Sequence, residues 1–110
     1  MKTNEKEFNG LLCRPIEQFG VSFKDIKIPK WWDIPTAQEG IDLVNNEDFV
    51  TWAKFEDEKH DFYVHQPFLK NKGKYAAWLG CGNDDFDLGG NDDLGSSDAV
   101  RGVLLVKRKK

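Results

Sequence analysis

Hydrophobic and polar residues follow two different rhythms along the chain, and the rhythm predicts which segments are helices and which are strands. The segment 4–12 begins at a capping residue, Asn4, and stops before Pro15, which predicts a short helix. The segment VSFKDIKI (21–28) alternates apolar and polar residues with one slip, which predicts a strand with a bulge.

The clearest local signal is the sequence Thr-Ala-Gln-Glu at 36–39. A Thr followed three residues later by Glu has the form of a capping box, in which each side chain bonds the backbone N–H of the other residue. Apolar residues then recur at helical spacing until the pair Asn45–Asn46. A helix is therefore predicted to begin at Thr36, with Thr36 and Glu39 as structural residues.

The pattern turns extended from Phe49 onward. Aromatic and β-branched runs separated by turn-forming residues predict strands, and the runs are FVTWAKF (49–55), DFYVHQPFL (61–69), KYAAWLGC (74–81) and AVRGVLLVK (99–107). The continuous apolar run 104–106 predicts a central strand covered on both faces. The chain is therefore predicted to be an α+β domain with one or two short helices and a mostly antiparallel twisted sheet.

One stretch, GNDDFDLGGNDDLG (82–95), contains five aspartates, two asparagines and four glycines. Turn-forming residues predict a long loop, whose aspartates face solvent, a partner or Arg101. A single Ca²⁺ is the alternative, with Asp84, Asp92 and Asp98 as candidate ligands. The eight-residue repeat of GNDD departs from the nine-residue calcium repeat, and no Glu follows at the EF-hand position, so we expect no metal and no cofactor.

Length and charge further restrict the number of domains and the classes of partner. A chain of 110 residues predicts one domain, 1–110, with an N-terminal segment (1–29), a core (30–107) and a basic tail (108–110). The net charge is −3 and the last four residues are all basic, so residues 1–106 carry −7. This balance argues against direct nucleic-acid binding. No signal peptide and no membrane span are recognisable, which predicts a protein that is cytoplasmic at synthesis and not inserted in a membrane.

The residues that usually carry chemistry are sparse. Cys13 and Cys81 are predicted to be reduced, buried thiols. His60 and His65 have no zinc-finger spacing to them, and on a strand the two histidines would face opposite sides. No nucleophile grouping or phosphate loop is present, so we expect no enzyme.

The order of several motifs resembles the C-type-lectin-like modules of the Lcl C-terminal domain and major paralogous domain group. The matching stretches are WDIPTAQEGIDLV (32–44), DFYVHQPFL (61–69), YAAWLGC (75–81) and AVRGVLLV (99–106), within residues 30–107. Leu79–Gly80 stands where those modules have Ser-Ser, and the stretch 78–100 is shorter than theirs. The resemblance implies a small twisted sheet with a flanking helix and one long variable loop for recognition.

The same resemblance implies a non-enzymatic binding or structural module of a phage virion or bacterial surface. Its partner would be a protein or a glycan, and it would act in a homo-oligomer or larger assembly. If the segment is extended, the adjacent Trp31 and Trp32 cannot both point inward, so one should be packed and the other exposed; the alternative is that both rings partly cover the edge of the sheet. The candidate partner-binding residues are Trp31, Trp32, Asp84, Asp85, Asp87, Asp92 and Asp93. Trp78 and Arg101 are expected to be structural, with a loop aspartate pairing with Arg101.

An alternative function uses the acidic charge directly. Two acidic patches, 47–61 and 84–98, and the absence of a signal peptide fit a small intracellular inhibitor that mimics nucleic acid or fills a basic groove. Salt-sensitive binding would distinguish this alternative from a binding module that recognises its partner mainly through aromatic side chains.

Overall fold

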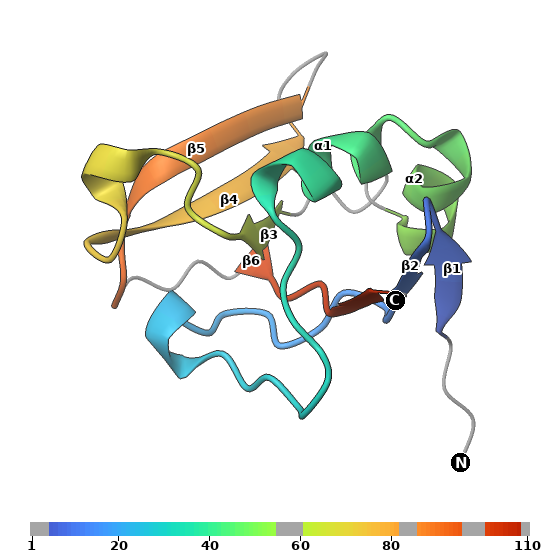
Figure 1. Ribbon diagram of the computed structural model, residues 1–110, viewed down its shortest axis with the longest axis horizontal. Helices are drawn as coiled ribbons and strands as arrows, with labels where there is room; N and C mark the ends of the chain where they lie inside the picture. The colour runs from blue at the N-terminus through green and yellow to red at the C-terminus, as the bar shows by residue number, and fades with distance from the viewer. Residues whose placement is uncertain (1–4, 55–60, 82–85, 96–100, 109–110) are drawn as a thin grey trace.

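The computed structural model describes residues 5–54, 61–81, 86–95 and 101–108, and within these residues the fold is α+β (Figure 1). Its helices and strands are β1 (Lys6–Phe8), β2 (Leu11–Cys13), the 3-10 helix η1 (Phe23–Asp25), α1 (Ala37–Val44), α2 (Glu47–Ala53), β3 (Asp61–Val64), the 3-10 helix η2 (Leu69–Asn71), β4 (Tyr75–Cys81), β5 (Phe86–Asp93), β6 (Arg101–Gly102) and β7 (Val106–Arg108). The expectation of an α+β fold with short helices is confirmed.

The strands form two sheets. The smaller sheet has the order β1-β2-β7 and is antiparallel throughout. The larger has the order β5-β4-β3-β6, antiparallel except for the parallel pair β3–β6. Both helices lie on the side of the larger sheet that faces the smaller one (Figure 1). The two sheets and two helices therefore enclose a shared core.

The helix predicted over 4–12 is wrong, because its described part forms the β1–β2 hairpin. Asn9 and Gly10 form the turn with φ angles of 53° and 81°. Two consecutive positive φ values are the requirement of a type I′ hairpin turn, and Asn-Gly is the dipeptide that best accepts them. The turn chemistry outweighs the helical spacing of the neighbouring apolar residues.

The strand predicted over 21–28 is also wrong. Residues 23–25 form η1, and Ser22 Oγ donates to Asp25 Oδ2 at 2.7 Å. The side-chain amide of Gln18 donates to the Lys27 carbonyl and accepts from the Lys27 N–H, each at 3.0 Å. One side chain thus satisfies backbone groups that a neighbouring strand would otherwise pair.

Helix α1 confirms the capping-box prediction. The Glu39 N–H donates to Thr36 Oγ1 at 3.1 Å, and the Thr36 N–H donates to Glu39 Oε1 at 2.9 Å. The extended segment predicted from Phe49 is wrong, since Phe49 lies in α2. Asn46 Oδ1 caps this second helix by accepting from the N–H groups of Asp48 and Phe49. A strong N-cap here outweighs the β-propensity of the aromatic residues.

The segment 101–106 is buried throughout, but it is not one strand. It pairs first as β6 and then as β7, so it joins the two sheets. Leu104 and Val106 pack in the larger core cluster, and Val103 and Leu105 pack in the smaller one. The prediction of burial on both faces is therefore confirmed, whereas the single central strand is wrong.

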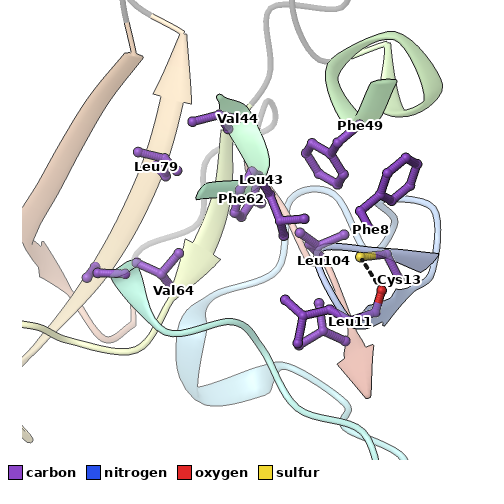
Figure 2. Close-up of a cluster of buried hydrophobic side chains, with 13 residues drawn as sticks. Phe8, Leu11, Cys13, Leu43, Val44, Phe49, Phe62, Val64, Leu79 and Leu104 are labelled. Atoms are coloured by element: carbon purple, nitrogen blue, oxygen red, sulfur yellow. Dashed lines mark hydrogen bonds between the residues drawn. The ribbon is translucent and has the colours of Figure 1, made fainter. Parts of the chain in front are cut away.

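The larger core cluster lies between the helices and the two sheets (Figure 2). Phe8 and Phe49 meet edge to face at its α2 end, with centroids 5.5 Å apart. Val44 and Leu79 bring α1 against β4 at the other end. The smaller cluster lies on the opposite face of the larger sheet and is covered by the irregular segment between β2 and α1.

The long loop predicted over 82–95 is wrong for residues 86–93, which form β5 and pair with β4 from one end to the other. Phe86 and Leu88 pack against the larger core cluster, and this packing holds the strand in place. The indole of Trp78 lies over Gly89, where a Cβ would collide with it, so this glycine serves close packing and not a turn. Residues 82–85 lie outside the described residues.

Candidate functional site

A turn at residues 29–32 presents the most exposed aromatic side chain among the described residues. The Trp32 N–H donates to the Pro29 carbonyl at 3.1 Å and closes the turn. Trp31 occupies its third position with a φ of 76°, and the side chain is 71% exposed. The Lys30 Nζ lies 5.2 Å from the centroid of the Trp31 ring. Figure 1 shows the turn (teal) at the edge of the molecule, away from both sheets.

Trp32, unlike Trp31, is packed, although the two residues lie in a turn and not in an extended segment. Its ring packs against the smaller core cluster, and the Arg14 guanidinium lies over it at 4.4 Å from the centroid. Arg14 Nε is also bonded to Glu5 Oε2 at 3.3 Å. One tryptophan is thus packed and its neighbour exposed.

The residue after this pair, Asp33, fixes the turn to the rest of the fold. Its backbone exchanges two hydrogen bonds with Val106, at 3.0 and 2.7 Å. Its carboxylate accepts from the Ile34 N–H at 2.8 Å and from Arg108 Nη1 at 3.2 Å. His65 Nε2 lies 2.9 Å from Asp33 Oδ1 and 3.0 Å from Oδ2. Backbone and side chain together hold the end of the turn.

Arg108 extends this arrangement to α1. Its guanidinium makes a two-bond pair with Glu39, Nε to Oε2 at 2.8 Å and Nη2 to Oε1 at 2.6 Å. Asp33, Glu39, His65 and Arg108 form what we call the ionic network. It joins the turn, α1, β7 and the residue that follows β3, and the His65 N–H also donates to the Pro35 carbonyl at 3.0 Å. A bidentate Arg–carboxylate pair fixes geometry more firmly than a single ion pair.

The charges of the network depress the pKa values of its acids. The hydrogen bonds from Arg108 are the main reason why the pKa of Glu39 lies below its usual value. Burial raises the pKa of Asp33, but the hydrogen bonds from His65 and Arg108 outweigh it, so the net shift is downward. The two carboxylates raise the pKa of Arg108 above its usual value. Both acids are therefore ionised at neutral pH.

We expect the ionic network to stabilise the fold at neutral pH and to lose this effect in acid. A depressed folded-state pKa gives stability that is present above the unfolded pKa, about 4 for these acids, and that is lost as pH falls through the folded value. Asp33→Asn/Glu39→Gln should lower the free energy of unfolding by about 1–2 kcal/mol at pH 7. Glutamine keeps the capping-box bond.

Urea unfolding between pH 7 and pH 2 measures this effect. The double variant should show a shallower fall in the free energy of unfolding below about pH 4 than the unmodified chain. The matched control is Asp42→Asn, an exposed carboxylate on α1 that accepts from Gln38. Equal acid dependence in the double variant and the unmodified chain would contradict the assignment.

The aspartates proposed to bind a partner lie elsewhere. Asp87 and Asp93 are exposed positions on β5, which Figure 1 shows on the opposite side of the molecule from the turn. Asp84, Asp85 and Asp98 lie outside the described residues, as does the side chain of Asp92. Among the described residues, no group of three or more His, Cys, Asp or Glu side chains is placed to hold a metal ion.

Arg101 is buried, as expected, and it forms an ion pair with Asp61 of β3. Arg101 Nη2 lies 3.5 Å from Asp61 Oδ2, and its guanidinium lies 5.0 Å from the Trp78 ring centroid and 5.6 Å from that of Tyr63. The predicted pairing of Arg101 with an aspartate of residues 84, 85 or 98 falls outside the described residues. Arg101 on β6 and Trp78 on β4 contact each other in the larger sheet.

Cys13 is a free, buried thiol, as predicted. Its Sγ donates to the Leu11 carbonyl at 3.7 Å. Burial, with a smaller effect from the charge of Glu39, raises the pKa of this thiol to about 12. The thiolate form is therefore scarce at neutral pH, which makes Cys13 a packing residue. The side chain of Cys81 and the residue His60 lie outside the described residues.

The sequence alone does not predict the ionic network, for a physical reason. Its local signals mark Glu39 as a helix cap and Arg108 as part of a basic tail, and the two residues are 69 positions apart. Asp33 and His65 are 32 residues apart. No local spacing connects such pairs; only the position of Asp33 beside two tryptophans marks the site.

No family model, no curated protein and no solved structure matches this chain. Among the described residues, no helix is both long enough and apolar enough to cross a membrane. The geometry of the turn and of the ionic network is therefore the basis for the proposal that follows.

Proposed function

We propose that this protein is a non-enzymatic binding module and that Trp31 is the anchor of its recognition surface. The observation that carries the proposal is the conformation of this residue. A third turn position with positive φ normally holds glycine or asparagine, and a bulky side chain there is an outlier. Here a tryptophan takes that position and exposes 71% of its surface.

This placement costs stability in the free protein. The left-handed conformation costs a non-glycine residue roughly 1–2 kcal/mol, and exposure of the indole gains nothing from burial. Strained backbone that persists in a folded protein is concentrated at binding and catalytic positions. Tryptophan is also the residue type most enriched among the side chains that dominate binding energy.

The two residues that follow Trp31 are held by contacts with the rest of the fold, which suits an anchor. Trp32 is packed beneath Arg14, and Asp33 is held by Val106, His65 and Arg108. A side chain presented by a fixed backbone loses less entropy on binding than one on a mobile loop. The cation of Lys30 beside the ring adds a charged group next to the apolar centre.

An exposed indole beside a charged group suits either a pocket on a partner protein or the apolar face of a sugar ring. The order of the lectin-like motifs supports the same two partner classes. The setting we propose is a phage virion or a bacterial surface, where such a module would act within a larger assembly.

We expect Trp31→Gly to increase stability while it abolishes binding. Glycine adopts the positive φ without strain, which raises the free energy of unfolding. Glycine also makes the unfolded chain more flexible, which lowers it slightly. The net increase should be about 1 kcal/mol. Trp31→Ala removes the ring but keeps the strain, so its stability should stay near that of the unmodified chain. Urea unfolding measures both variants.

Binding is measured with the immobilised chain, by capture of partner protein from source cells and on a glycan array. The unmodified chain and Leu69→Ala, which truncates an exposed apolar residue elsewhere, should retain the same partner or sugar. Both Trp31 variants should lose it. Retention of partner by Trp31→Gly would overturn the proposal, and so would a loss of stability in that variant.

A further inference from the structure

A second group of exposed apolar side chains lies on the loop between β3 and β4, residues 65–74, and on the first residue of β4. Leu69 is 86% exposed, Phe68 43% and Tyr75 40%. Figure 1 shows the loop (yellow) protruding beyond the end of β4 and β5, at the end of the molecule opposite β1 and β2. It is therefore a surface separate from the Trp31 turn.

Hydrogen bonds to β5 hold the loop in this conformation. The Gln66 amide donates to the carbonyls of Gly90 at 2.8 Å and Tyr75 at 3.1 Å. Asn71, which is buried, donates to the Gly90 carbonyl at 3.0 Å and to Asn91 Oδ1 at 2.7 Å. These hydrogen bonds hold the loop in the conformation that exposes Leu69.

The charge of the loop is opposite in sign to that of the protein. Lys70, Lys72 and Lys74 are all exposed, and no acidic residue occurs from His65 to Cys81, whereas the whole chain carries −3. In the register of β4 with β5, the acidic position directly opposite the loop is Asp93, which pairs with Tyr75. The loop therefore combines an apolar tip with a local concentration of positive charge.

We propose that this loop docks onto the surface of an anionic lipid bilayer. Leu69 and Phe68 would enter the boundary between headgroups and acyl chains, and the three lysines would contact anionic headgroups. The contact is peripheral, because the inserted part is a loop tip and not a spanning segment.

The nature of the side chains favours a bilayer over a nucleic acid. The most exposed residue is leucine, which neither stacks on a base nor forms hydrogen bonds. The Phe68 ring lies against the backbone of Gly90 and is only 43% exposed, so it presents less of its surface to a base than an open stacking platform does. A two-fold contact of this loop with a second copy would place lysines near lysines, which disfavours a dimer formed around the loop tips.

Co-sedimentation with vesicles tests the proposal. The full chain should bind vesicles of phosphatidylcholine with about 30% phosphatidylserine, bind phosphatidylcholine alone far more weakly, and dissociate as salt rises. Leu69→Ser should lower the partition coefficient roughly tenfold or more. Lys70→Gln/Lys72→Gln/Lys74→Gln should lower it roughly a hundredfold.

Three further variants separate this surface from its alternatives. Lys6→Gln/Lys27→Gln/Lys107→Gln removes three exposed lysines elsewhere and should retain most of the binding, and Ile28→Ala, which truncates an exposed apolar residue elsewhere, should bind as the unmodified chain does. Asp93→Asn should strengthen binding severalfold, since it removes a negative charge beside the loop. All these positions are exposed, and matching urea transitions would show that the variants are folded.

Equal binding to both vesicle types, or none to either, would overturn the proposal. So would equal losses in the two triple-lysine variants. A dimer detected by sedimentation equilibrium that is weakened by both Leu69→Ser and Asp93→Asn would assign the loop to a second copy instead. Loop-dependent binding to a single-stranded oligonucleotide, without vesicle binding, would assign it to nucleic acid.

Discussion

Phe49→Ala is expected to lower the free energy of unfolding by about 3–5 kcal/mol, the range for truncating a buried phenylalanine. Phe49 is fully buried on α2. Its ring meets Phe8 of β1 edge to face at 5.5 Å and Phe62 of β3 at 6.4 Å, and it lies 6.1 Å from Trp52. One side chain thus joins the smaller sheet, a helix and the larger sheet. A domain of this size has only about 5–15 kcal/mol of stability in total.

Urea unfolding monitored by circular dichroism measures the loss. Leu69→Ala is the matched control, because it also truncates an apolar side chain but at an exposed position, where changes usually stay within about 0.5 kcal/mol. A loss below about 1 kcal/mol in Phe49→Ala would show that the aromatic cluster does not connect the two sheets as described.

Some local sequence signals predict their elements correctly. Others are present but compete with a stronger strand or helix pattern in the same segment. The capping box at Thr36 and Glu39 needs only four consecutive residues, and α1 begins there. Asn46 followed by two acidic residues is an equally local start signal for α2, yet the aromatic content of the segment favoured a strand. The Asn9–Gly10 turn is likewise readable from the sequence.

Strand β5 shows what composition cannot predict. Glycine and aspartate are depleted in strands and typical of turns, so residues 86–93 resemble a loop in isolation. Their pairing with β4 and the packing of Phe86 and Leu88 on the core supply the stability that intrinsic propensity lacks. The stability of a strand depends on the strand it pairs with, and the local sequence does not identify that partner.

The candidate site also has features that the sequence predicts and features that it does not. Adjacency predicts opposite orientations of Trp31 and Trp32 on an extended backbone, whereas the chain produces them in a turn. The positive φ of Trp31 is not predicted, because turn rules assign that position to glycine. The ionic network depends on β7 passing beside the turn, and the Asp33–Val106 bonds that place it there join residues from opposite ends of the chain.

The buried ion pair under the larger sheet gives the second large effect. Asp61 and Arg101 are partners in the parallel register of β3 and β6, and their charged groups are 3.5 Å apart. The Arg101 side chain is only 7% exposed, with the rings of Tyr63 and Trp78 beside it. Removing one member of such a pair leaves a charge in a low-dielectric site with less compensation.

We therefore expect Asp61→Ala to lower the free energy of unfolding by about 3 kcal/mol, at the lower end of the range for breaking a buried pair. Asp61→Ala/Arg101→Met should be more stable than Asp61→Ala alone, because the second change removes the buried charge that has lost Asp61 and leaves an apolar side chain of similar length. A double-mutant cycle by urea unfolding measures the coupling.

The control for this cycle is the partly exposed pair Arg14–Glu5, whose groups are 3.3 Å apart. Glu5→Gln should cost less than about 1 kcal/mol, since exposed ion pairs contribute little. Two results would contradict interdependence of Asp61 and Arg101. One is a loss of unfolding free energy in Asp61→Ala no larger than that in Glu5→Gln. The other is an additive loss in Asp61→Ala/Arg101→Met, equal to the sum of the losses in the two single variants. Strong coupling would instead show that β6, only two residues long, is held to β3 by this charge pair as well as by its backbone bonds.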